Sequence, residues 1–358
     1  MAACDACLRR TALVAALSGW LDVEWRRRDV APRVLALPDE DLLAIGPKEL
    51  RARYERFAAA PVRAAAERAG VALVCRCADA YPPRLRALPD PPAVLHVVGD
   101  PAALTIEEGV AIVGARRATG YGLDVSRALG RGLSRAGVPV VSGLALGIDA
   151  AAHEGALEGP ARPVAVLAAA PDVAYPQRNR VLHAAIAERG AVVSELPPGS
   201  SAYRWCFVAR NRIVAALAQV VVIVEATERS GSLTTADFAA DLGCTVAAVP
   251  GRVTNRTADG TNGLIQSGAA LVRGAGDVLE LLAETTGKPR REPARATPPA
   301  LAPELLTLLA AVEEGRGSLG ELATGPDDAR TVLAGLGELE FRGLIRRTFG
   351  GRWEPAAQ

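Results

Sequence analysis

Asp149 and His153 stand four residues apart in the stretch SGLALGIDAAAH, which occupies positions 142–153. On a helix this spacing places a carboxylate one turn from an imidazole, the arrangement of a general-base pair. The same spacing suits a helix start, where the acid caps backbone N–H groups and the histidine hydrogen-bonds to the acid. Because the local sequence supplies no nucleophile for the pair, we interpret Gly147, Asp149 and His153 as residues that fasten the loop, and we predict no catalytic residue.

The segment GARRATGYG, at positions 114–122, offers a different chemistry, the binding of an anion. Its glycines let the backbone approach a ligand, and a helix that begins near Tyr121 would direct free N–H groups at that ligand. Arg116 and Arg117 add positive charge beside the loop. The spacing is not the G-x-G-x-x-G dinucleotide fingerprint, and no P-loop lysine is nearby. We therefore expect neither NAD nor ATP, and no cofactor.

Further loops repeat these residue types. Arginines occur with aromatic side chains in PDVAYPQRN and FVARNR, and a Ser/Gly turn opens the stretch SGSLTTADFA. Arginine contacts phosphate and aromatic rings stack on bases, so the combination is typical of single-strand binding. The rings available for stacking are Tyr175, Tyr203, Trp205 and Phe207. The predicted DNA- or phosphate-binding residues are Gly114, Arg116, Arg117, Ser142, Gly143, Asn179, Phe207, Arg210, Asn211, Arg212, Gly231 and Ser232.

Six cysteines are present, and four of them lie close in sequence, Cys4 with Cys7 and Cys75 with Cys77. Together these four could supply thiolates to one zinc ion, although the C-x-C spacing is tighter than the usual C-x2-C. Free thiols are the alternative, because a long cytosolic chain argues against a disulfide framework. We favour free thiols and predict no metal.

The composition argues against two properties, a positive charge spread over the whole chain and a membrane-spanning segment. The 41 basic and 40 acidic side chains nearly cancel, so any polyanion site must be a local patch. No run approaches the roughly 20 apolar residues that span a bilayer. The apolar run at 11–21 lacks a small-residue cleavage site and continues into DVEWRRR, which predicts an amphipathic helix rather than a secretory signal. We expect a cytoplasmic protein with no membrane partner.

The binding loops follow short apolar runs that alternate with helical stretches from residue 109 onward. The predicted strands are GVAIVG, VPVVSG, RPVAVLA, AVVSE, VVVIVEA and TVAAVPG. Runs this apolar are typical of a parallel sheet that helices cover on both faces. We predict an α/β fold with a Rossmann-like, doubly wound, mainly parallel sheet, whose ligands gather at the carboxyl ends of the strands.

The regions around this sheet differ from it in pattern. We predict a small N-terminal helical domain at 1–75 and a Rossmann-like DNA-binding domain at 76–287, entered through a proline-dense connector at 80–101. A basic, proline-rich linker at 288–300 follows. Residues 301–358 contain three helical stretches and then a hairpin signal at Gly350-Gly351, the order of a winged-helix domain.

Eight segments carry a resemblance to a known family. They are VAIVGARRATGYG, VVSGLALGIDAAAHEGAL, AYPQRNRVL, VVSELPPG, ARNRIVAAL, VVIVEATERSGSLTTADFA, VPGRV and TNGLIQSGA. In this order and spacing they resemble the DNA-processing protein A family over roughly residues 80–285. Arg116 matches the arginine of the family's first glycine loop, and Ser142-Gly143 matches its SG turn. Residues 210–212 match its RNR motif, and Gly231-Ser232 matches its SGS turn.

The chain departs from the family pattern at two places. After the third strand it reads VLAAAPDVAYP, where the family usually has a glycine-rich turn. Before the RNR motif it has Phe207-Val208-Ala209, where the family usually places Phe-Pro. The first departure concerns loop shape. The second keeps the aromatic ring and removes the proline that would stiffen its approach, which puts the strength of binding in question.

The resemblance implies a non-enzymatic recombination mediator that binds incoming single-stranded DNA, protects it, and helps load a RecA-type recombinase during natural transformation. It also implies a homodimer. Two alternatives stay open. A nucleoside-monophosphate phosphoribohydrolase-like enzyme would use Glu225 or Asp149 as its base, although the PGG-x-G-T pattern of such hydrolases is absent from the sequence. A regulatory module would use the winged helix as its working part and the sheet as a scaffold.

Overall fold

The computed structural model describes residues 3–28, 34–289, 301–323, 325–348 and 350–355. The chain divides into two compact units, residues 1–291 and 292–358. Most of the linker predicted at 288–300 lies outside the described residues. Among the helices that the structure describes, none is both long and apolar enough to cross a membrane.

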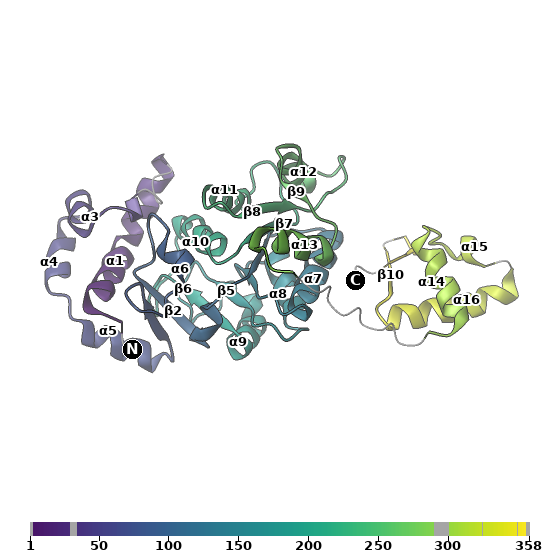
Figure 1. The fold of residues 1–358 in the computed structure, drawn as a ribbon, viewed down its shortest axis with the longest axis horizontal. Helices are drawn as coiled ribbons and strands as arrows, with labels where there is room; N and C mark the ends of the chain where they lie inside the picture. The colour runs from purple at the N-terminus through teal and green to yellow at the C-terminus, as the bar shows by residue number, and fades with distance from the viewer. Residues whose placement is uncertain (1–2, 29–33, 290–300, 324, 349, 356–358) are drawn as a thin grey trace. The chain divides into compact units, whose positions relative to one another are not determined.

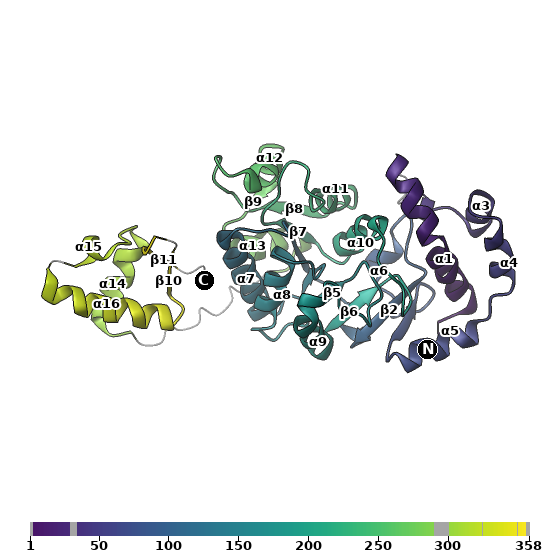
Figure 2. The same ribbon diagram turned by 180° about the vertical axis from the view of Figure 1, so that it is seen from behind.

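A nine-stranded sheet forms the centre of the first unit (Figures 1 and 2). Its strands are β1 (Ala72–Cys75), β2 (Val94–Gly99), β3 (Val110–Val113), β4 (Val140–Ser142), β5 (Val164–Val166), β6 (Ala191–Ser194), β7 (Val220–Ile223), β8 (Thr245–Ala248) and β9 (Ala270–Leu271). Their order across the sheet is β1-β2-β6-β5-β4-β3-β7-β8-β9. The β1–β2 and β2–β6 pairs are antiparallel, and the remaining pairs are parallel. The predicted mainly parallel sheet, with all six strands expected after residue 109, is confirmed.

Helices cover both faces of this sheet. They are α7 (Gly120–Arg135), α8 (Ile148–Ala156), α9 (Arg180–Arg189), α10 (Arg204–Ala216), α11 (Leu233–Asp241), α12 (Asp259–Gln266) and α13 (Ala275–Thr286). Alternate side chains of a strand point to opposite faces. On β3, Val110 and Ile112 pack in one core cluster with α7, α8 and α13, whereas Ala111 and Val113 pack in another with α10 and α11. The strands are mostly apolar because both faces of the sheet are buried, and the polar residues within them, such as Ser142 and Ser194, are buried too.

The N-terminal helices pack beside the part of the sheet that carries β2 (Figure 1). They are α1 (Asp5–Arg28), α3 (Asp39–Ile45), α4 (Glu49–Glu55) and α5 (Ala59–Arg68). The amphipathic helix expected at 11–21 is part of α1. The fully buried Trp205 of α10 donates from its indole nitrogen to the carbonyl of Ser18 at 3.0 Å. The N-terminal helices therefore share a core with the sheet unit.

The proline-dense segment at 80–101 is not the connector that was predicted. It contains α6 (Pro83–Arg86) and then β2, which pairs with β1 and β6 within the sheet. The prediction is wrong because AVLHVVG, directly after Pro91-Pro92, is a strand-type run in which the polar His96 is fully buried. β1 likewise lies inside the region that was expected to be helical.

The second unit has three helices followed by a hairpin. They are α14 (Pro303–Glu313), α15 (Leu319–Leu322), α16 (Pro326–Phe341), β10 (Ile345–Arg347) and β11 (Trp353–Pro355). Val312, Leu339 and Trp353 belong to its core. Gly350 and Gly351 both have positive φ, but Arg347 pairs with Trp353, so residues 348–352 separate the strands and the loop is longer than the predicted two-residue turn. The order of elements is the predicted one, and the winged-helix assignment stays a prediction.

Candidate functional site

A cavity of about 530 Å³ lies at the carboxyl ends of the parallel strands. The chain order across the sheet reverses between β3 and β7, and the loops of adjacent strands diverge at such a reversal, which leaves a crevice. We call this crevice the switch-point cavity. Its lining residues are Val113, Gly114, Ala115, Arg116, Arg117, Ala145, Asp149, Phe207, Val208, Arg210, Asn211, Thr227, Ser230, Gly231, Ser232, Thr235 and Thr257.

The structure brings most of the predicted binding residues together at this cavity. Those that line it are Gly114, Arg116, Arg117, Asp149, Phe207, Arg210, Asn211, Gly231 and Ser232. The predicted residues that are not part of its lining are Ser142, Gly143, Gly147, His153, Asn179 and Arg212.

The first wall carries exposed positive charge and an aromatic rim. Arg116 and Arg117 are both exposed on the loop after β3. The guanidinium carbon of Arg116 lies 4.9 Å from the centre of the Phe207 ring. The Phe207 ring lies 5.6 Å from that of Tyr175, which is 47% exposed. A cation and two rings in this arrangement can contact a phosphate and stack on a base.

Asp149 fastens the loop between β4 and α8. Its Oδ2 accepts hydrogen bonds from the backbone N–H groups of Gly143 at 3.1 Å and Ala145 at 3.3 Å. Burial raises the pKa of Asp149, while Arg210 and these two N–H groups act against that rise. Gly147 has φ +81°, and a Cβ there would lie 2.3 Å from the Ala115 carbonyl oxygen. The two loops beside the cavity therefore pack backbone against backbone.

His153 does not make the hydrogen bond to Asp149 that its spacing suggested. It is fully buried, and neither of its ring nitrogens makes a hydrogen bond of normal geometry to a described residue. Burial lowers the pKa of His153 to about 3, although the nearby backbone of Ser142 acts to raise this pKa, and the nearby Arg210 acts in the same direction as burial. The imidazole is therefore a neutral core side chain, and it neither acts as a base nor fastens the loop through Asp149.

Ser142 also has a different role from the one expected. Its side chain is fully buried, and its hydroxyl donates to the carbonyl of Ile112 at 2.6 Å. This bond ties β4 to the neighbouring β3 and leaves the hydroxyl inaccessible to a ligand. The expected contact between Ser142 and a phosphate is corrected accordingly.

Arg210 is a buried cation at the floor of the cavity. It is 6% exposed and donates from Nη1 to the carbonyl of Val166 at 2.9 Å. Burial lowers the pKa of Arg210, and the charge of Asp149 acts against that effect. A Cβ on Gly143 would lie 1.4 Å from Nη1 of Arg210. A glycine is therefore required at 143 to leave room for the guanidinium, which explains the Ser-Gly turn better than a direct ligand contact does.

The opposite wall is the turn that opens α11. The side-chain amide of Asn211 donates to the Gly231 carbonyl at 3.1 Å and to Oγ1 of Thr234 at 2.8 Å. The hydroxyls of Ser230 and Ser232 are 2.8 Å apart. Asn211 thus fixes a Ser/Gly turn at the N-terminus of a nine-residue helix, where backbone N–H groups favour an anion. Asn179 has a similar supporting role, because its amide donates to the Leu144 carbonyl at 2.9 Å.

Glu225, the other acid considered as a catalytic base, is engaged elsewhere. It is 3% exposed, and its two oxygens accept from the hydroxyl of Thr119 at 2.5 Å and from the N–H of Thr119 at 2.8 Å. Thr119 is the N-cap of α7, so Glu225 holds the start of that helix against the end of β7. This geometry positions a loop and presents no carboxylate to the cavity.

The charge around the cavity has one dominant sign. Its lining contains the guanidinium groups of Arg116, Arg117 and Arg210, and the single carboxylate of Asp149. The hydroxyls of Thr227, Ser230, Ser232, Thr235 and Thr257 add neutral hydrogen-bond donors. Such a set can hold an anion of phosphate size and shape.

Comparison with known proteins places the chain in a family. The profile of the DNA recombination-mediator protein A family matches residues 72–283, more than half of the chain. The chain belongs to the DNA recombination-mediator protein A family. A putative DNA processing protein DprA from Mycobacterium tuberculosis is 40% identical over 268 residues, which cover 73% of this chain and 68% of that protein. DNA processing protein DprA from Bacillus subtilis is 37% identical over 223 residues, which cover 62% of this chain and 75% of that protein.

Solved structures of DprA proteins share the fold. The X-ray structure of DprA from Streptococcus pneumoniae superposes with a TM-score of 0.62 and 34% identity, covering 68% of this chain and 86% of that one. DprA from Helicobacter pylori, a structure described for its single-stranded DNA binding mode, superposes with a TM-score of 0.55 and 32% identity. The latter match covers 60% of this chain and 98% of that one. The resemblance inferred from the sequence motifs is confirmed.

The RNR motif of this DNA recombination-mediator A chain divides into different roles. Arg210 and Asn211 line the cavity, whereas Arg212 is 2% exposed and pairs with Asp90 at 2.7 Å and Glu195 at 2.9 Å. Burial opposes the charge of Arg212, but the two carboxylates outweigh it and raise the pKa of Arg212. The expected DNA contact of Arg212 is corrected, because its guanidinium is consumed in a buried ion pair that ties α10 to the segment before β2.

The departure at Val208 does not interrupt the family site. Helix α10 runs unbroken from Arg204 to Ala216, so Phe207 and Val208 both reach the cavity lining from its first turns. Trp205 and Tyr203, also considered for base stacking, differ from Phe207. Trp205 is fully buried against α1, and Tyr203 is the N-cap residue before α10 and 37% exposed.

Sequence reasoning missed part of the lining. Thr227 and Ser230 lie in the stretch EATERSGS, in which only Gly231 and Ser232 were predicted to bind. Thr257 lies in the loop after β8, for which no binding residue was predicted. Only their position after a strand could have identified these residues, since side chains that follow adjacent parallel strands meet at one edge of the sheet.

Proposed function

We propose that this chain binds single-stranded DNA in the switch-point cavity and serves as a recombination mediator without catalytic activity. The observation that carries the proposal is the charge of the cavity, where Arg116, Arg117 and Arg210 outnumber the one carboxylate, Asp149. Arg210 gives the strongest support for an anionic ligand, because its Nε is buried and has no hydrogen-bond partner within the described residues. A backbone phosphate would supply both charge and acceptor oxygens.

The rim of the cavity supports a single strand as the ligand. Tyr175 and Phe207 stand next to Arg116, and Tyr175 is almost half exposed. A base can stack on such rings when it is unpaired, whereas bases in a duplex are already stacked on each other. The Helicobacter pylori relative, described for its single-stranded DNA binding mode, points in the same direction.

The wider role follows from membership of the family. We propose that the chain protects incoming single-stranded DNA and helps to load a RecA-type recombinase during natural transformation. We further propose that it acts in the cytoplasm and as a homodimer. The relatives named DNA processing protein DprA in Bacillus subtilis and Streptococcus pneumoniae support a role in DNA processing.

A nucleotide hydrolase on the same fold is the competing function. It would need a carboxylate free to activate water near the bound phosphate. Glu225 is held by Thr119, and Asp149 is buried and holds the loop at Gly143. Incubation of the chain with nucleoside monophosphates should therefore release no free base, and release at a rate proportional to the protein concentration would favour the hydrolase.

The direct test of the proposal compares two ligands of the same sequence. Fluorescence anisotropy with a labelled single-stranded oligonucleotide, competed by unlabelled single strand or by duplex, gives both affinities in one buffer. We expect the single strand to compete about tenfold better or more. Equal competition by the duplex would contradict a stacking site and would favour the second unit as the binding module.

A further inference from the structure

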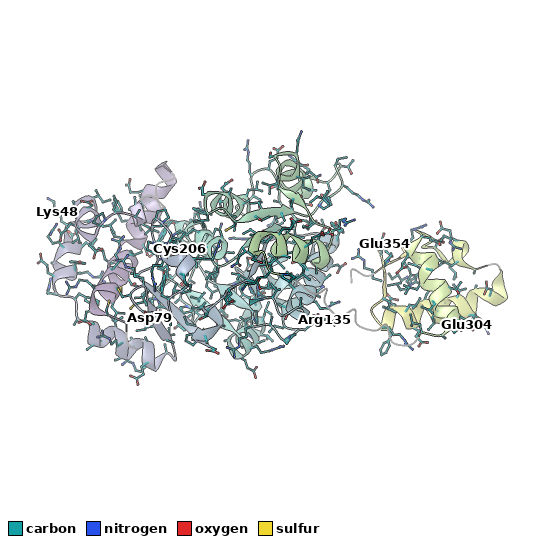
Figure 3. All side chains as sticks on the ribbon, in the orientation of Figure 1. Lys48, Asp79, Arg135, Cys206, Glu304 and Glu354 are labelled. Atoms are coloured by element: carbon teal, nitrogen blue, oxygen red, sulfur yellow. The ribbon has the colours of Figure 1, made fainter. Side chains whose placement is uncertain are left out.

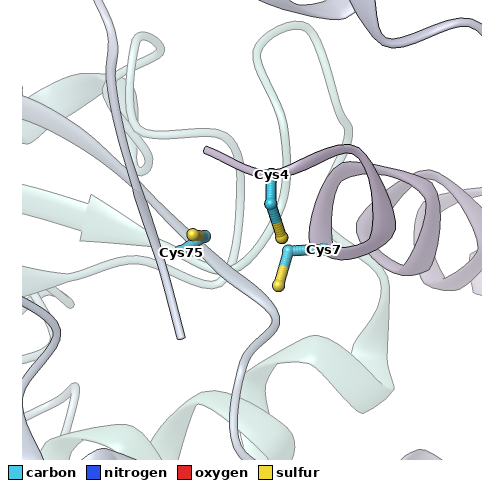
Figure 4. Close-up of side chains that lie close together, drawn as sticks. All are labelled: Cys4, Cys7 and Cys75. Atoms are coloured by element: carbon cyan, nitrogen blue, oxygen red, sulfur yellow. The ribbon is translucent and has the colours of Figure 1, made fainter. Parts of the chain in front are cut away.

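Two pairs of cysteines that are far apart in the sequence meet where the start of α1 packs on the end of β1. Cys4 precedes the first residue of α1 and Cys7 lies in its first turn. Cys75 is the last residue of β1, and Cys77 follows it in a turn. Figure 4 shows Cys4 and Cys7 at the start of the helix beside Cys75 on the strand. The site is distinct from the switch-point cavity, whose lining contains none of these residues.

The distances between the sulfur atoms match those around one metal ion. The Sγ atoms of Cys4, Cys7 and Cys75 all lie within 4.8 Å of one another. The Sγ atom of Cys77 lies 3.9 Å from that of Cys4 and 3.6 Å from that of Cys7. A zinc–sulfur bond of about 2.3 Å in tetrahedral geometry separates neighbouring sulfurs by about 3.8 Å. Both separations of Cys77 lie close to this value, but its sulfur is not among the three that lie within 4.8 Å of one another, so Cys77 would close the site by a rotation of its exposed side chain.

We propose that Cys4, Cys7, Cys75 and Cys77 bind one structural zinc ion. Four thiolates from two short cysteine pairs complete a closed tetrahedral site with no open position, which is the form that structural zinc takes. The tight spacing from Cys75 to Cys77, which argued against zinc in the sequence, is offset in the fold. The strand ends at Cys75 and the chain turns, with the N–H of Ala78 donating to the Cys75 carbonyl at 2.9 Å.

The surroundings suit a negatively charged metal–thiolate centre. The site lies at the N-terminus of a 24-residue helix, where the helix dipole favours anions. Arg63 lies beside it and donates to the Ala3 carbonyl at 2.7 Å. Leu8, Ala59, Ala93 and Val94 form an apolar shell around the cysteines.

A disulfide explains the cluster less well. The Sγ atoms of Cys7 and Cys77 lie 3.6 Å apart, well beyond the roughly 2.05 Å of a sulfur–sulfur bond. One disulfide would also use only two of the four sulfurs. The zinc ion would instead fasten the N-terminus of α1 to the β1–β2 hairpin at four points. We expect it to stabilise the junction between the N-terminal helices and the sheet.

Metal analysis of the full-length chain, purified under reducing conditions without added chelator, tests the proposal. We expect about one zinc ion per chain. Cys4→Ser and Cys77→Ser should each lower the zinc content to near background. The matched controls are Cys206→Ser and Cys244→Ser, which remove thiols that are buried elsewhere, Cys206 in α10 (Figure 3) and Cys244 before β8. The controls should keep the full zinc content.

A second measurement covers the case in which the serine variants fail to fold. The wild-type chain is stripped with a chelator and titrated with Co²⁺, whose visible bands report tetrahedral thiolate ligation. We expect saturation at about one equivalent, and loss of the bands when Zn²⁺ is added. Wild-type protein that carries no zinc and yields no such bands would overturn the proposal. So would a disulfide within the cluster detected by mass spectrometry, or stoichiometric iron in place of zinc.

Discussion

Arginine side chains that lie close together in this family site have different partners, and their partners decide their roles. Arg116 is exposed above the Phe207 ring, Arg210 is buried with partial compensation from Asp149, and Arg212 is buried between two carboxylates. Only the first two have charge left for a ligand. The sequence motif R-N-R contains no sign of this division, because Asp90 lies 122 residues away from Arg212 and meets it only in the fold.

Replacing Arg116 with alanine should therefore reduce DNA affinity without reducing stability, whereas replacing Arg212 with alanine should reduce the stability of the fold. Arg116→Ala should weaken single-strand binding roughly tenfold and flatten its salt dependence by about 0.7 in the log–log slope, with unchanged stability. Arg212→Ala leaves two buried carboxylates without their partner and should cost about 3–5 kcal/mol in the free energy of unfolding. Urea denaturation and anisotropy on both variants separate the effects. Normal stability in Arg212→Ala would contradict the assigned ion pair.

The buried His153 should make the fold sensitive to acid. Its pKa is lowered to about 3 in the native state, against about 6.5 in an unfolded chain. Between these values the unfolded state binds a proton that the native state does not, so stability falls as the pH drops below about 6.5, by about 1 kcal/mol per pH unit. His153→Gln should reduce the slope of unfolding free energy against pH from 6.5 to 4.5. His96 is buried in the wild type and in the variant, so it contributes equally to both slopes. Identical slopes for the two proteins would contradict the burial of His153.

At the scale of elements, the reversal of strand order between β3 and β7 creates the site, and the helices that follow these strands supply its walls. The six strands after residue 109 were predictable because buried parallel strands are apolar on both faces. β2 was not, since Pro91-Pro92 precedes it and His96 interrupts it, and β9 has two residues. The meeting of the glycine loops at one edge of the sheet was predictable, but the burial of Ser142 and Gly143 behind the wall depends on packing that no local pattern encodes.

Substitution of Gly143 tests how the loops pack, because this glycine lets the β4–α8 loop close over Arg210. A Cβ there would lie 1.4 Å from Nη1 of Arg210, so the guanidinium must leave its bond to the Val166 carbonyl. Gly143→Ala should cost about 1–3 kcal/mol in stability and weaken DNA binding. Gly276→Ala in α13 is the control, since a Cβ there meets nothing within 4 Å. Indistinguishable behaviour of the two variants in denaturation and binding would contradict the packing.

On the scale of the whole molecule, 41 basic and 40 acidic residues leave almost no net charge, so attraction to DNA must come from a local site. The chain has two compact units. Every residue that lines the switch-point cavity falls between Val113 and Thr257 in the first of them. We therefore expect single-strand binding to reside in the first unit, with the second unit available for other contacts.

Removal of residues 292–358 should accordingly leave single-strand affinity within about threefold of the full chain at equal salt. Arg116→Ala introduced into the shortened chain should lower that affinity as much as it does in the full chain. Anisotropy of the four proteins measures both effects. A shortened chain that folds but has lost most of its binding would transfer the function to the second unit.

A salt titration of binding tests whether a local cluster of guanidinium groups binds the backbone of a single strand. The dissociation constant for a single-stranded oligonucleotide is measured over a range of salt concentrations in parallel with the matching duplex. Contacts from Arg116, Arg117 and Arg210 predict that log K falls against log salt with a slope of about −2 for the single strand, which binds more tightly than the duplex throughout. A slope near zero, or a duplex bound as tightly as the single strand, would contradict the account.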